Sequence, residues 1–546
     1  MKILVVENDK GFRDAWVELL KEFGFNVIQM ESLQGNTPKE LHSMAFDLAL
    51  IDRRADRDEN PDDITGQLFA IELCALGTPT ALITAFLPDE VVLFDLLRTG
   101  AVTAIADKRI EKLELAHCIE EFRQSRRFPN CVAQFSWKGK HDPFNEKDWE
   151  LVAGNVQGLT VSGAEVAVLF RSLIPPCALR VKLEKMTPGH GGAAVFHAMV
   201  SSGDGPVVDE VAIKYGERAE IMGEAMRYDR HVGPLPDGVA SHLRWRKETK
   251  TLGAIAYSWV GDSIEDGIPF GPVKREHDHL TWRRRQSALD RLFSVSLNPW
   301  YRVYRSNSAQ IKTKIRLLDY YTGDGGYFRE VPFADGALPP DLVSPIQNES
   351  NTWDFGSYGI LPNPIPWLID GSGSTLELSR YSPCHGDLHV KNIFVLPDDS
   401  PRLIDFGDTA LGHIFQDFAA LEVSIRLSCT TTTNLELLKR AADSASSTKS
   451  LGEFIDHRVI DKVEDNLRKT LVTTMQIRRS ALDAVGSNSS DGLLKEYLFA
   501  LIMRLLRYAS GIADEVSTED AVEKQTLLWH ALYSAAKATE QALACD

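Results

Sequence analysis

Short apolar runs alternate with helical patterns over the first 125 residues. The runs expected as strands are Lys2–Val6, Asn26–Met30, Leu48–Ile51, Thr80–Ile83 and Thr103–Ala106. Helical patterns follow them, beginning near Gly11, Pro38, Gly66, Pro88 and Ile110. Strands that alternate with helices are typical of a parallel sheet with crossover helices. The pattern therefore predicts a doubly wound α/β domain with a five-stranded parallel sheet over residues 1–125. Its ligands should gather at the carboxyl ends of the strands.

The alternation ends after residue 125, and a different pattern starts near residue 176. We expect strands at Leu179–Lys185, Ala193–Val200 and Val208–Tyr215, followed by mostly helical periodicity after about residue 263. The predicted domain boundaries are 1–125 for the α/β domain, 126–175 for a connector, 176–262 for a small lobe and 263–546 for a large lobe. A stretch at about 300–380 is rich in Gly, Pro and aromatic residues and is the candidate substrate-binding insert.

The sequence predicts a β-hairpin in the large lobe. The apolar run Ile393–Leu396, the turn-forming run Pro397–Pro401 and the return strand Arg402–Ile404 define it. His-Gly-Asp-Leu-His-Val-Lys-Asn precedes the hairpin, and Asp-Phe-Gly-Asp follows it. An Asp can orient a hydroxyl and accept its proton, whereas an Asn and a second Asp can hold magnesium against a nucleoside triphosphate. These residue types at this spacing point to phosphoryl transfer.

The spacing resembles the catalytic and metal loops of the aminoglycoside phosphotransferase and choline kinase group, a branch of the protein-kinase-like fold. The resemblance implies an α+β bilobal domain with a mostly helical C-terminal lobe, which uses ATP and Mg²⁺. It assigns Asp387 as the catalytic residue and Asn392 and Asp405 as metal ligands. It also assigns His385 and Asp417 as structural braces of the catalytic loop.

The acceptor and the subgroup are also suggested by resemblance. His389 stands where protein Ser/Thr kinases usually carry Lys, which favours a small hydroxylated acceptor over a protein hydroxyl, the main rival. The run from Gly412 to Glu422 resembles kinase-like domains of bacterial conflict systems named ternary-complex-associated domains.

The small lobe carries candidate ATP contacts. A turn containing Gly189, Gly191 and Gly192 joins two expected strands, and glycine lets backbone amides approach phosphates closely. The third strand ends in Val-Ala-Ile-Lys214, which is like the lysine strand of kinase folds. Glu220 and Glu224 follow on a helix one turn apart, and we prefer Glu224 as the partner of Lys214.

Polar residues cluster at the strand ends of the first domain. Glu7, Asn8 and Asp9 follow strand one, Asp52 ends strand three, Thr84 ends strand four and Lys108 follows strand five. This set resembles the flavodoxin-like receiver domain of bacterial response regulators. The resemblance implies that Asp52 is the phosphoacceptor for a sensor histidine kinase or another phosphodonor, and that Thr84 and Lys108 contact the phosphoryl oxygens. The resemblance further implies that Mg²⁺ is held by Glu7, Asn8, Asp9 and Asp52.

Asn8 departs from the receiver pattern, where a second carboxylate is usual. An amide oxygen can ligate magnesium but brings no charge, so two hypotheses stay open. In the first, receiver phosphorylation at Asp52 controls an ATP-dependent phosphotransferase in a two-component phosphorelay. In the second, the chain is a non-catalytic signalling scaffold, with a pseudo-receiver that only docks and a pseudokinase that binds nucleotide without transferring phosphate.

Composition and charge limit the remaining classes of function and localisation. The 546 residues carry a net charge of −17, which argues against nucleic-acid binding by the whole chain. We expect Arg283-Arg284-Arg285 to be a solvated basic face rather than a nucleic-acid contact. Seven scattered cysteines, no run of eighteen uncharged apolar residues and no signal peptide favour a cytoplasmic protein without a membrane span. An apolar stripe at 494–506 favours core, with a homodimer surface as the alternative.

Overall fold

The chain forms two compact units in this computed structural model. Unit 1 comprises residues 1–226 and 242–259, and unit 2 comprises residues 227–241 and 260–546. The structure describes residues 1–55, 63–85, 92, 95–97, 99–108, 110, 112–140, 142–156, 158–176, 178–186, 192–202, 207–260, 268–271, 280–307, 315–322, 331–333, 347–348, 351–430, 432–453, 464–486, 492–514 and 521–545. None of the helices formed by these residues is both long enough and apolar enough to cross a membrane.

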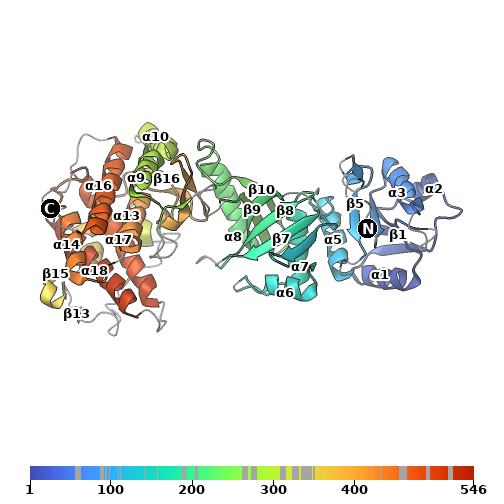
Figure 1. The fold of residues 1–546 in the computed structure, drawn as a ribbon, viewed down its shortest axis with the longest axis horizontal. Helices are drawn as coiled ribbons and strands as arrows, with labels where there is room; N and C mark the ends of the chain where they lie inside the picture. The colour runs from blue at the N-terminus through green and yellow to red at the C-terminus, as the bar shows by residue number, and fades with distance from the viewer. Residues whose placement is uncertain are drawn as a thin grey trace. The chain divides into compact units, whose positions relative to one another are not determined.

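The first part of unit 1 is a five-stranded parallel sheet in the order β2-β1-β3-β4-β5. Its elements are β1 (Lys2–Val6), α1 (Lys10–Glu22), β2 (Asn26–Met30), α2 (Pro38–Ser43), β3 (Leu48–Asp52), α3 (Thr65–Ala75), β4 (Thr80–Thr84), β5 (Ala104–Asp107) and α5 (Lys112–Ser125). Because successive strand residues face opposite ways, α1 and α5 cover one face and α2 and α3 the other. Figure 1 shows α1 on one side of β1, with α2 and α3 on the other. The flavodoxin-like fold class is confirmed.

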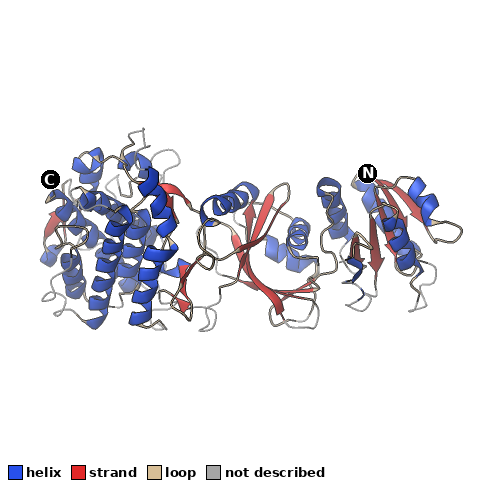
Figure 2. Cartoon of the chain, turned by 90° about the horizontal axis from the view of Figure 1, so that it is seen from above, coloured by secondary structure: helices blue, strands red, loops and turns tan. Residues whose placement is uncertain are grey.

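The second part of unit 1 is a six-stranded sheet in the order β10-β11-β9-β8-β7-β6. The strands are β6 (Gln134–Trp137), β7 (Arg180–Lys185), β8 (Ala194–Ser201), β9 (Val207–Glu217), β10 (Leu243–Glu248) and β11 (Leu252–Ser258). Only the β6–β7 pair is parallel. Figure 2 shows these strands as a twisted red sheet.

Residues 126–175, which the sequence suggested as a connector, contribute to this sheet. They supply β6 at its edge together with α6 (Glu146–Ala153) and α7 (Gly163–Leu173), whose buried faces share one core with β7, β8, β9 and β11. Ser162 caps α7 by accepting a hydrogen bond from the Glu165 amide. Trp149 and Phe170 stack edge-to-face within this core. The segment is therefore part of the folded small lobe.

The two faces of the six-stranded sheet carry different helices. Ile213 and Tyr215 on β9 point into the core formed with α6 and α7, so Lys214 between them faces the opposite side. On that opposite side, Gly253 lies close to Ile221 of α8 (Arg218–Arg227). A Cβ at this glycine would meet Ile221 Cβ at 3.0 Å. Lys214 is thereby directed toward α8.

Unit 2 is mostly helical, as Figure 2 shows in blue. Its elements are η1 (Tyr228–Val232), β12 (Ile268–Pro269), α9 (Trp282–Arg291), η2 (Leu292–Ser296), α10 (Asn298–Asn307), α11 (Leu317–Thr322), β13 (Gln347–Asn348), β14 (Thr352–Asp354), η3 (Gly356–Tyr358), β15 (Ile360–Pro362), α12 (Pro364–Ile369), η4 (Ser372–Thr375), β16 (Tyr381–Cys384), η5 (Val390–Asn392), β17 (Ile393–Val395), β18 (Pro401–Leu403), β19 (Ala410–His413), α13 (Gln416–Ser428), α14 (Leu435–Ala445), α16 (Asp465–Val485), α17 (Leu493–Asp514) and α18 (Ala521–Leu543). The expected α+β kinase-like fold with a helical C-terminal region is confirmed.

The expected hairpin is present as β17 and β18, which pair Ile393 with Leu403. β12 adds a third strand beside β17. Within the candidate insert at about 300–380, the described β14–β15 pair buries Trp353 and Phe355, and the Phe355 ring lies 5.0 Å from that of Tyr533 on α18. This part of the insert is therefore core rather than a free binding surface.

Candidate functional site

The loop before the hairpin is held by one buried carboxylate. β16 delivers His385 and Gly386, and the Asp417 carboxylate accepts hydrogen bonds from both backbone amides, at 2.6 and 3.0 Å. The Asp417 side chain is buried at the start of α13, where the helix N-terminus favours negative charge. Burial nevertheless raises the pKa of Asp417 from its usual value, although the two amides and the His385 and Arg504 charges lower it. Asp417 braces the loop without facing solvent.

Glycine is required at position 386 because the loop makes a tight approach there. Gly386 has φ +87°, and a Cβ on it would lie 2.2 Å from the Asp408 carbonyl oxygen. Arg504 of α17 donates to the Gly386 carbonyl at 2.6 Å. The His385 ring makes a further contact, in which Nε2 donates to the Ile404 carbonyl at 2.9 Å. The loop is thus fixed to the segment that directly follows β18 of the hairpin.

Asp387 is the carboxylate of this loop that is both partly exposed and ionised. Its side chain is 42% exposed, and its Oδ2 lies 3.3 Å from His389 Nε2. Burial raises the pKa of Asp387, but the hydrogen bond and charge of His389, with the charges of Arg504 and His385, outweigh it and hold this pKa at about 2. The group is therefore ionised at neutral pH, as a proton acceptor must be.

Asn392 is positioned by the same loop. Its Nδ2 donates to the Asp387 carbonyl at 2.9 Å, which leaves the amide oxygen as the acceptor atom. Asp405, on the far side of the hairpin, is exposed and has φ +61°, a left-handed conformation that Asp adopts more readily than most residues. Such conformations cluster at functional sites.

Asp408 is a site residue that the sequence analysis did not single out. Partial desolvation and the carboxylates of Asp387 and Asp405 raise its pKa. Negative charge that gathers beside Asp408 in this way favours a nearby cation. Its position directly after Asp-Phe-Gly was an available signal. Arg504, the other missed residue, lies 118 residues beyond its partner and had no local signal.

Unit 1 carries the candidate phosphate-contacting lysine. Lys214 Nζ lies 2.9 Å from Glu224 Oε2, and Tyr257 donates to Glu224 Oε1 at 2.9 Å. Glu224 is buried, whereas Glu220 is exposed. The Glu224 carboxylate therefore holds the Lys214 ammonium on the face of the sheet that α8 covers. Gly189 and Gly191 of the predicted phosphate loop lie outside the described residues, and Gly192 has φ +72°.

The receiver residues converge at the carboxyl ends of β1, β3 and β5. Lys108 Nζ lies 2.9 Å from Glu7 Oε2 and 3.0 Å from Asp52 Oδ2, and these three side chains are buried, as is Thr84. Burial, followed by the Asp52 charge, raises the pKa of Glu7. Burial lowers the pKa of Lys108, but Asp52 and Glu7 outweigh it, so the pKa is raised. Gly66 allows α3 to approach, because a Cβ there would lie 1.8 Å from the Asp52 carbonyl oxygen.

Asn8 and Asp9 have distinct surroundings. Asn8 Nδ2 donates to the Arg54 carbonyl at 2.8 Å, and its buried Oδ1 has no hydrogen-bond partner among the described residues. The Asp9 carboxylate accepts from the Phe12 amide at 3.0 Å and caps α1. An orphaned amide oxygen at the residue that follows Glu7, together with the Glu7 and Asp52 carboxylates that share one ammonium, is a set of oxygen donors of the kind that magnesium prefers. Its ligands would be Glu7, Asn8 and Asp52. Among the described residues, no three His, Cys, Asp or Glu side chains form a metal cage by themselves.

The chain therefore combines a flavodoxin-like α/β domain with a domain of the protein-kinase-like fold. The family described as Ternary complex associated domain 9 matches residues 347–507, which contain the β17–β18 hairpin. No curated protein matches the chain.

Several solved structures are similar to parts of the chain. The N-terminal domain of a response regulator/sensory box/GGDEF three-domain protein from Carboxydothermus hydrogenoformans is 20% identical, with a TM-score of 0.20, and the match covers 23% of this chain and 97% of that one. Choline kinase from Cryptosporidium parvum is 10% identical, with a TM-score of 0.37 and coverage of 72% and 96%. A microcompartment-associated aminopropanol kinase is 13% identical, with a TM-score of 0.35 and coverage of 67% and 93%.

Proposed function

We propose that this protein is an ATP-dependent phosphotransferase that acts on a hydroxyl acceptor. The observation that carries the proposal is Asp387, an ionised and partly exposed carboxylate on a loop that Asp417 and Arg504 hold rigidly. A carboxylate held in this way can orient an acceptor hydroxyl and take its proton, and positioning of this kind accounts for much of phosphoryl-transfer catalysis.

The other residues have roles that follow from their chemistry. Asn392 and Asp405 would hold magnesium, which neutralises charge on the transferred phosphoryl group when it is bound. Burial and then the carboxylates of Asp387 and Asp405 raise the pKa of Asp408, and that cation would offset the neighbouring negative charge. Lys214, oriented by Glu224, would contact the phosphates, with the glycines at 189, 191 and 192 offering backbone amides.

A small hydroxylated molecule is the acceptor we favour. His389 contacts Asp387 directly, where a protein kinase usually carries a lysine that meets the phosphoryl group. A protein hydroxyl remains the alternative acceptor. The test is phosphoryl transfer from radiolabelled ATP, in magnesium, to a panel of amino alcohols, aminoglycosides and Ser/Thr peptides. We expect label on at least one small molecule. A protein that binds no magnesium-ATP would rule out both acceptors, and one that binds it without transfer would favour the non-catalytic scaffold.

We expect His389→Ala to make phosphoryl transfer more sensitive to acid. His389 lowers the pKa of Asp387, so its removal should raise that pKa toward the ordinary value. A base is lost as pH falls through its pKa, so the variant should lose activity at a higher pH than the wild type. The measurement is the ratio of kcat/KM for variant and wild type from neutral pH down to about pH 3.5, which approaches the ordinary pKa of Asp, and effects common to both proteins cancel.

Lys391→Ala is the matched control for this pH experiment. Lys391 lies two residues further along the same loop and is exposed. The ratio of kcat/KM for Lys391→Ala to that for the wild type should not change with pH. A ratio for His389→Ala that also stays constant with pH would show that His389 does not set the ionisation of Asp387.

We further propose that phosphorylation of Asp52, by a sensor histidine kinase or another phosphodonor, controls the transferase. Contacts within unit 1 support this coupling. Glu114 on α5 forms a buried ion pair with Arg171 on α7, and Arg171 also donates to the Ala133 carbonyl at 2.7 Å. Glu121 of α5 lies 2.8 Å from Lys247 of β10. The helix that follows Lys108 thus contacts both β10 of the sheet that carries Lys214 and the helix α7 that packs against that sheet.

We expect acetyl phosphate to label Asp52 and to change transferase activity by at least about fivefold, the lower range of typical allosteric coupling. In this reaction an Asp52 oxygen attacks phosphorus and acetate leaves. Lys247→Ala should reduce the change in activity, because it removes the partly buried ion pair between α5 and β10. The assay compares transfer rates of the full chain with and without acetyl phosphate.

Two variants control the receiver experiment. Asp52→Ala should abolish both the label and the response. Arg244→Ala removes an ion pair with Asp209 from the same strand, β10, without touching α5, and should keep the response. If acetyl phosphate does not label the wild type, the domain is a pseudo-receiver. If Asp52→Ala changes its transfer rate as much as the wild type does, acetyl phosphate acts at a site other than Asp52.

A further inference from the structure

A polar cavity lies in unit 2 outside the catalytic loop. Its volume is about 260 Å³, and residues of α9, α13 and α16 line it. At about 30 Å³ per water, this is room for roughly eight water molecules or a small organic molecule. None of its lining residues belongs to the segment from His385 to Asp417. The cavity is therefore separate from the site proposed above.

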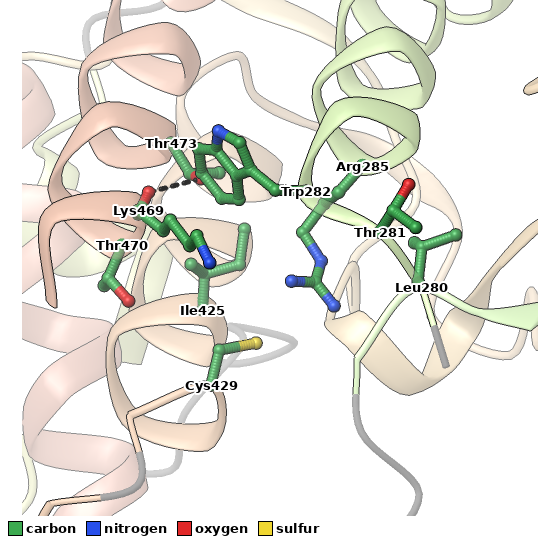
Figure 3. Close-up of a pocket in the computed structure, with 9 residues that line it drawn as sticks. All are labelled: Leu280, Thr281, Trp282, Arg285, Ile425, Cys429, Lys469, Thr470 and Thr473. Carbon is green, nitrogen blue, oxygen red and sulfur yellow. Dashed lines mark hydrogen bonds between the residues drawn. The ribbon is translucent and has the colours of Figure 1, made fainter. Parts of the chain in front are cut away.

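Two cations from different helices point into this cavity. Figure 3 shows the Arg285 guanidinium of α9 and the Lys469 ammonium of α16 directed into the same space. Arg285 is 7% exposed, and its Nε donates to the Phe270 carbonyl at 3.0 Å, which fixes the plane of the guanidinium. Arg285 is the third member of the arginine run that the sequence suggested to be a solvated face. That expectation is wrong for this residue.

The rest of the lining is suited to an anion. None of the described residues that line it carries a carboxylate. Thr281 is the N-cap of α9, so the positive end of that helix lies at the cavity. The Thr473 hydroxyl also lies in the lining, but it donates to the Lys469 carbonyl at 2.9 Å, so it contributes little to an anion. Lys469 also pairs with Asp465, at 2.7 Å, but both side chains are about half exposed, and such pairs contribute little. An anion can compete for this lysine.

Apolar surface lies beside the cations. The indole of Trp282 and the side chain of Ile425 form two further walls (Figure 3). We propose that this cavity binds a small organic phosphate, with its phosphate between Arg285 and Lys469 and its planar or apolar part against Trp282. Arginine and lysine together recognise phosphate by paired hydrogen bonds and charge.

The cavity also has a physical link to the catalytic loop. Ile425 follows Ser424 on α13, and the Ser424 hydroxyl accepts a hydrogen bond from the Val390 amide at 3.2 Å. The same helix carries Asp417 at its other end. A ligand that contacts α13 therefore acts on the helix that braces the loop, which is the role of an effector.

The test is isothermal titration calorimetry on the full chain, with phenyl phosphate as the probe and benzoate as the carboxylate counterpart. A non-hydrolysable ATP analogue is present with magnesium to fill any nucleotide site. We expect the wild type to bind phenyl phosphate more tightly than benzoate. Lys469→Glu should weaken binding of phenyl phosphate by at least about tenfold, because a charge-assisted contact becomes a repulsion. Thr473→Val should weaken it less.

Lys439→Glu is the matched control, because Lys439 forms an i,i+4 ion pair with Asp443 on α14, as Lys469 does with Asp465 on α16. It makes the same charge change and should leave binding unchanged. The site would be overturned if the wild type binds no phenyl phosphate at millimolar concentration, or if Lys439→Glu weakens binding as much as Lys469→Glu. Tighter binding of benzoate would overturn the assignment to a phosphate.

Discussion

Asp387→Asn is expected to lower kcat for phosphoryl transfer by about 10²–10⁴-fold, the usual contribution of a positioned general base. The substitution removes a proton acceptor but keeps the shape of the side chain. The structure around it should persist, because Asn392 bonds to the Asp387 carbonyl rather than to its carboxylate. Binding of magnesium-ATP, measured by calorimetry, should change much less than kcat.

Asp398→Asn is the control for this substitution. Asp398 lies at the turn of the same hairpin, where its carboxylate accepts from the Ser400 amide at 3.0 Å, away from the reactive loop. It should keep kcat within a few-fold of wild type. Equal rates for Asp387→Asn and wild type would contradict the catalytic assignment while leaving nucleotide binding intact as a separate result.

Glu422→Gln is expected to destabilise unit 2 by about 3–5 kcal/mol, the usual cost of breaking a buried ion pair from one side. The fully buried Glu422 carboxylate accepts from Arg478 at 2.8 and 2.9 Å, from Arg426 at 3.2 Å and from Tyr497 at 2.6 Å. Without its charge, two buried guanidinium groups remain uncompensated. The unit 2 thermal transition of the full chain should fall by roughly 5–10 °C.

The dependence of stability on pH gives a second measure of the same network. Burial raises the pKa of Glu422, but Arg478, Arg426 and Tyr497 outweigh it, so the folded-state pKa is lowered. A carboxyl with a lowered folded pKa contributes stability above its unfolded pKa and loses it as pH falls through the folded value. Glu422→Gln should lack this part of the acid dependence.

Glu436→Gln provides the comparison for Glu422→Gln. Glu436 pairs with Arg440 one turn along α14, and both side chains are about half exposed. Its loss should cost under about 0.5 kcal/mol, as is typical of exposed helix pairs. Similar melting temperatures for the two variants would show that the buried network does not stabilise unit 2.

Local patterns were sufficient for the receiver sheet and the catalytic hairpin. All five strands of the receiver sheet occur within about a residue of their predicted bounds, because the strands are short apolar runs interrupted by polar helix starts such as Thr37, which caps α2. The β17–β18 hairpin follows from the turn residues between two apolar runs. Such features depend on neighbours in the sequence, so the sequence alone reveals them.

Long-range packing explains what local patterns missed. We predicted residues 126–175 as a connector because β6 is a short edge strand, whose place beside β7 depends on a partner more than forty residues away. Arg285 read as solvated because its neighbours are charged, yet the helix turns its guanidinium inward to the Phe270 carbonyl. Helical periodicity does not specify which face meets a distant element.

The sequence by itself determined the chemistry of this protein: Asp387, Asn392 and Asp405 around one hairpin, and Asp52 and Lys108 at the ends of parallel strands. Only the tertiary structure decided how those groups behave. The low pKa of Asp387 depends partly on Arg504, and the Lys214–Glu224 pair depends on which sheet face α8 covers. Residue types are local, whereas burial and charge proximity arise only when distant segments fold together.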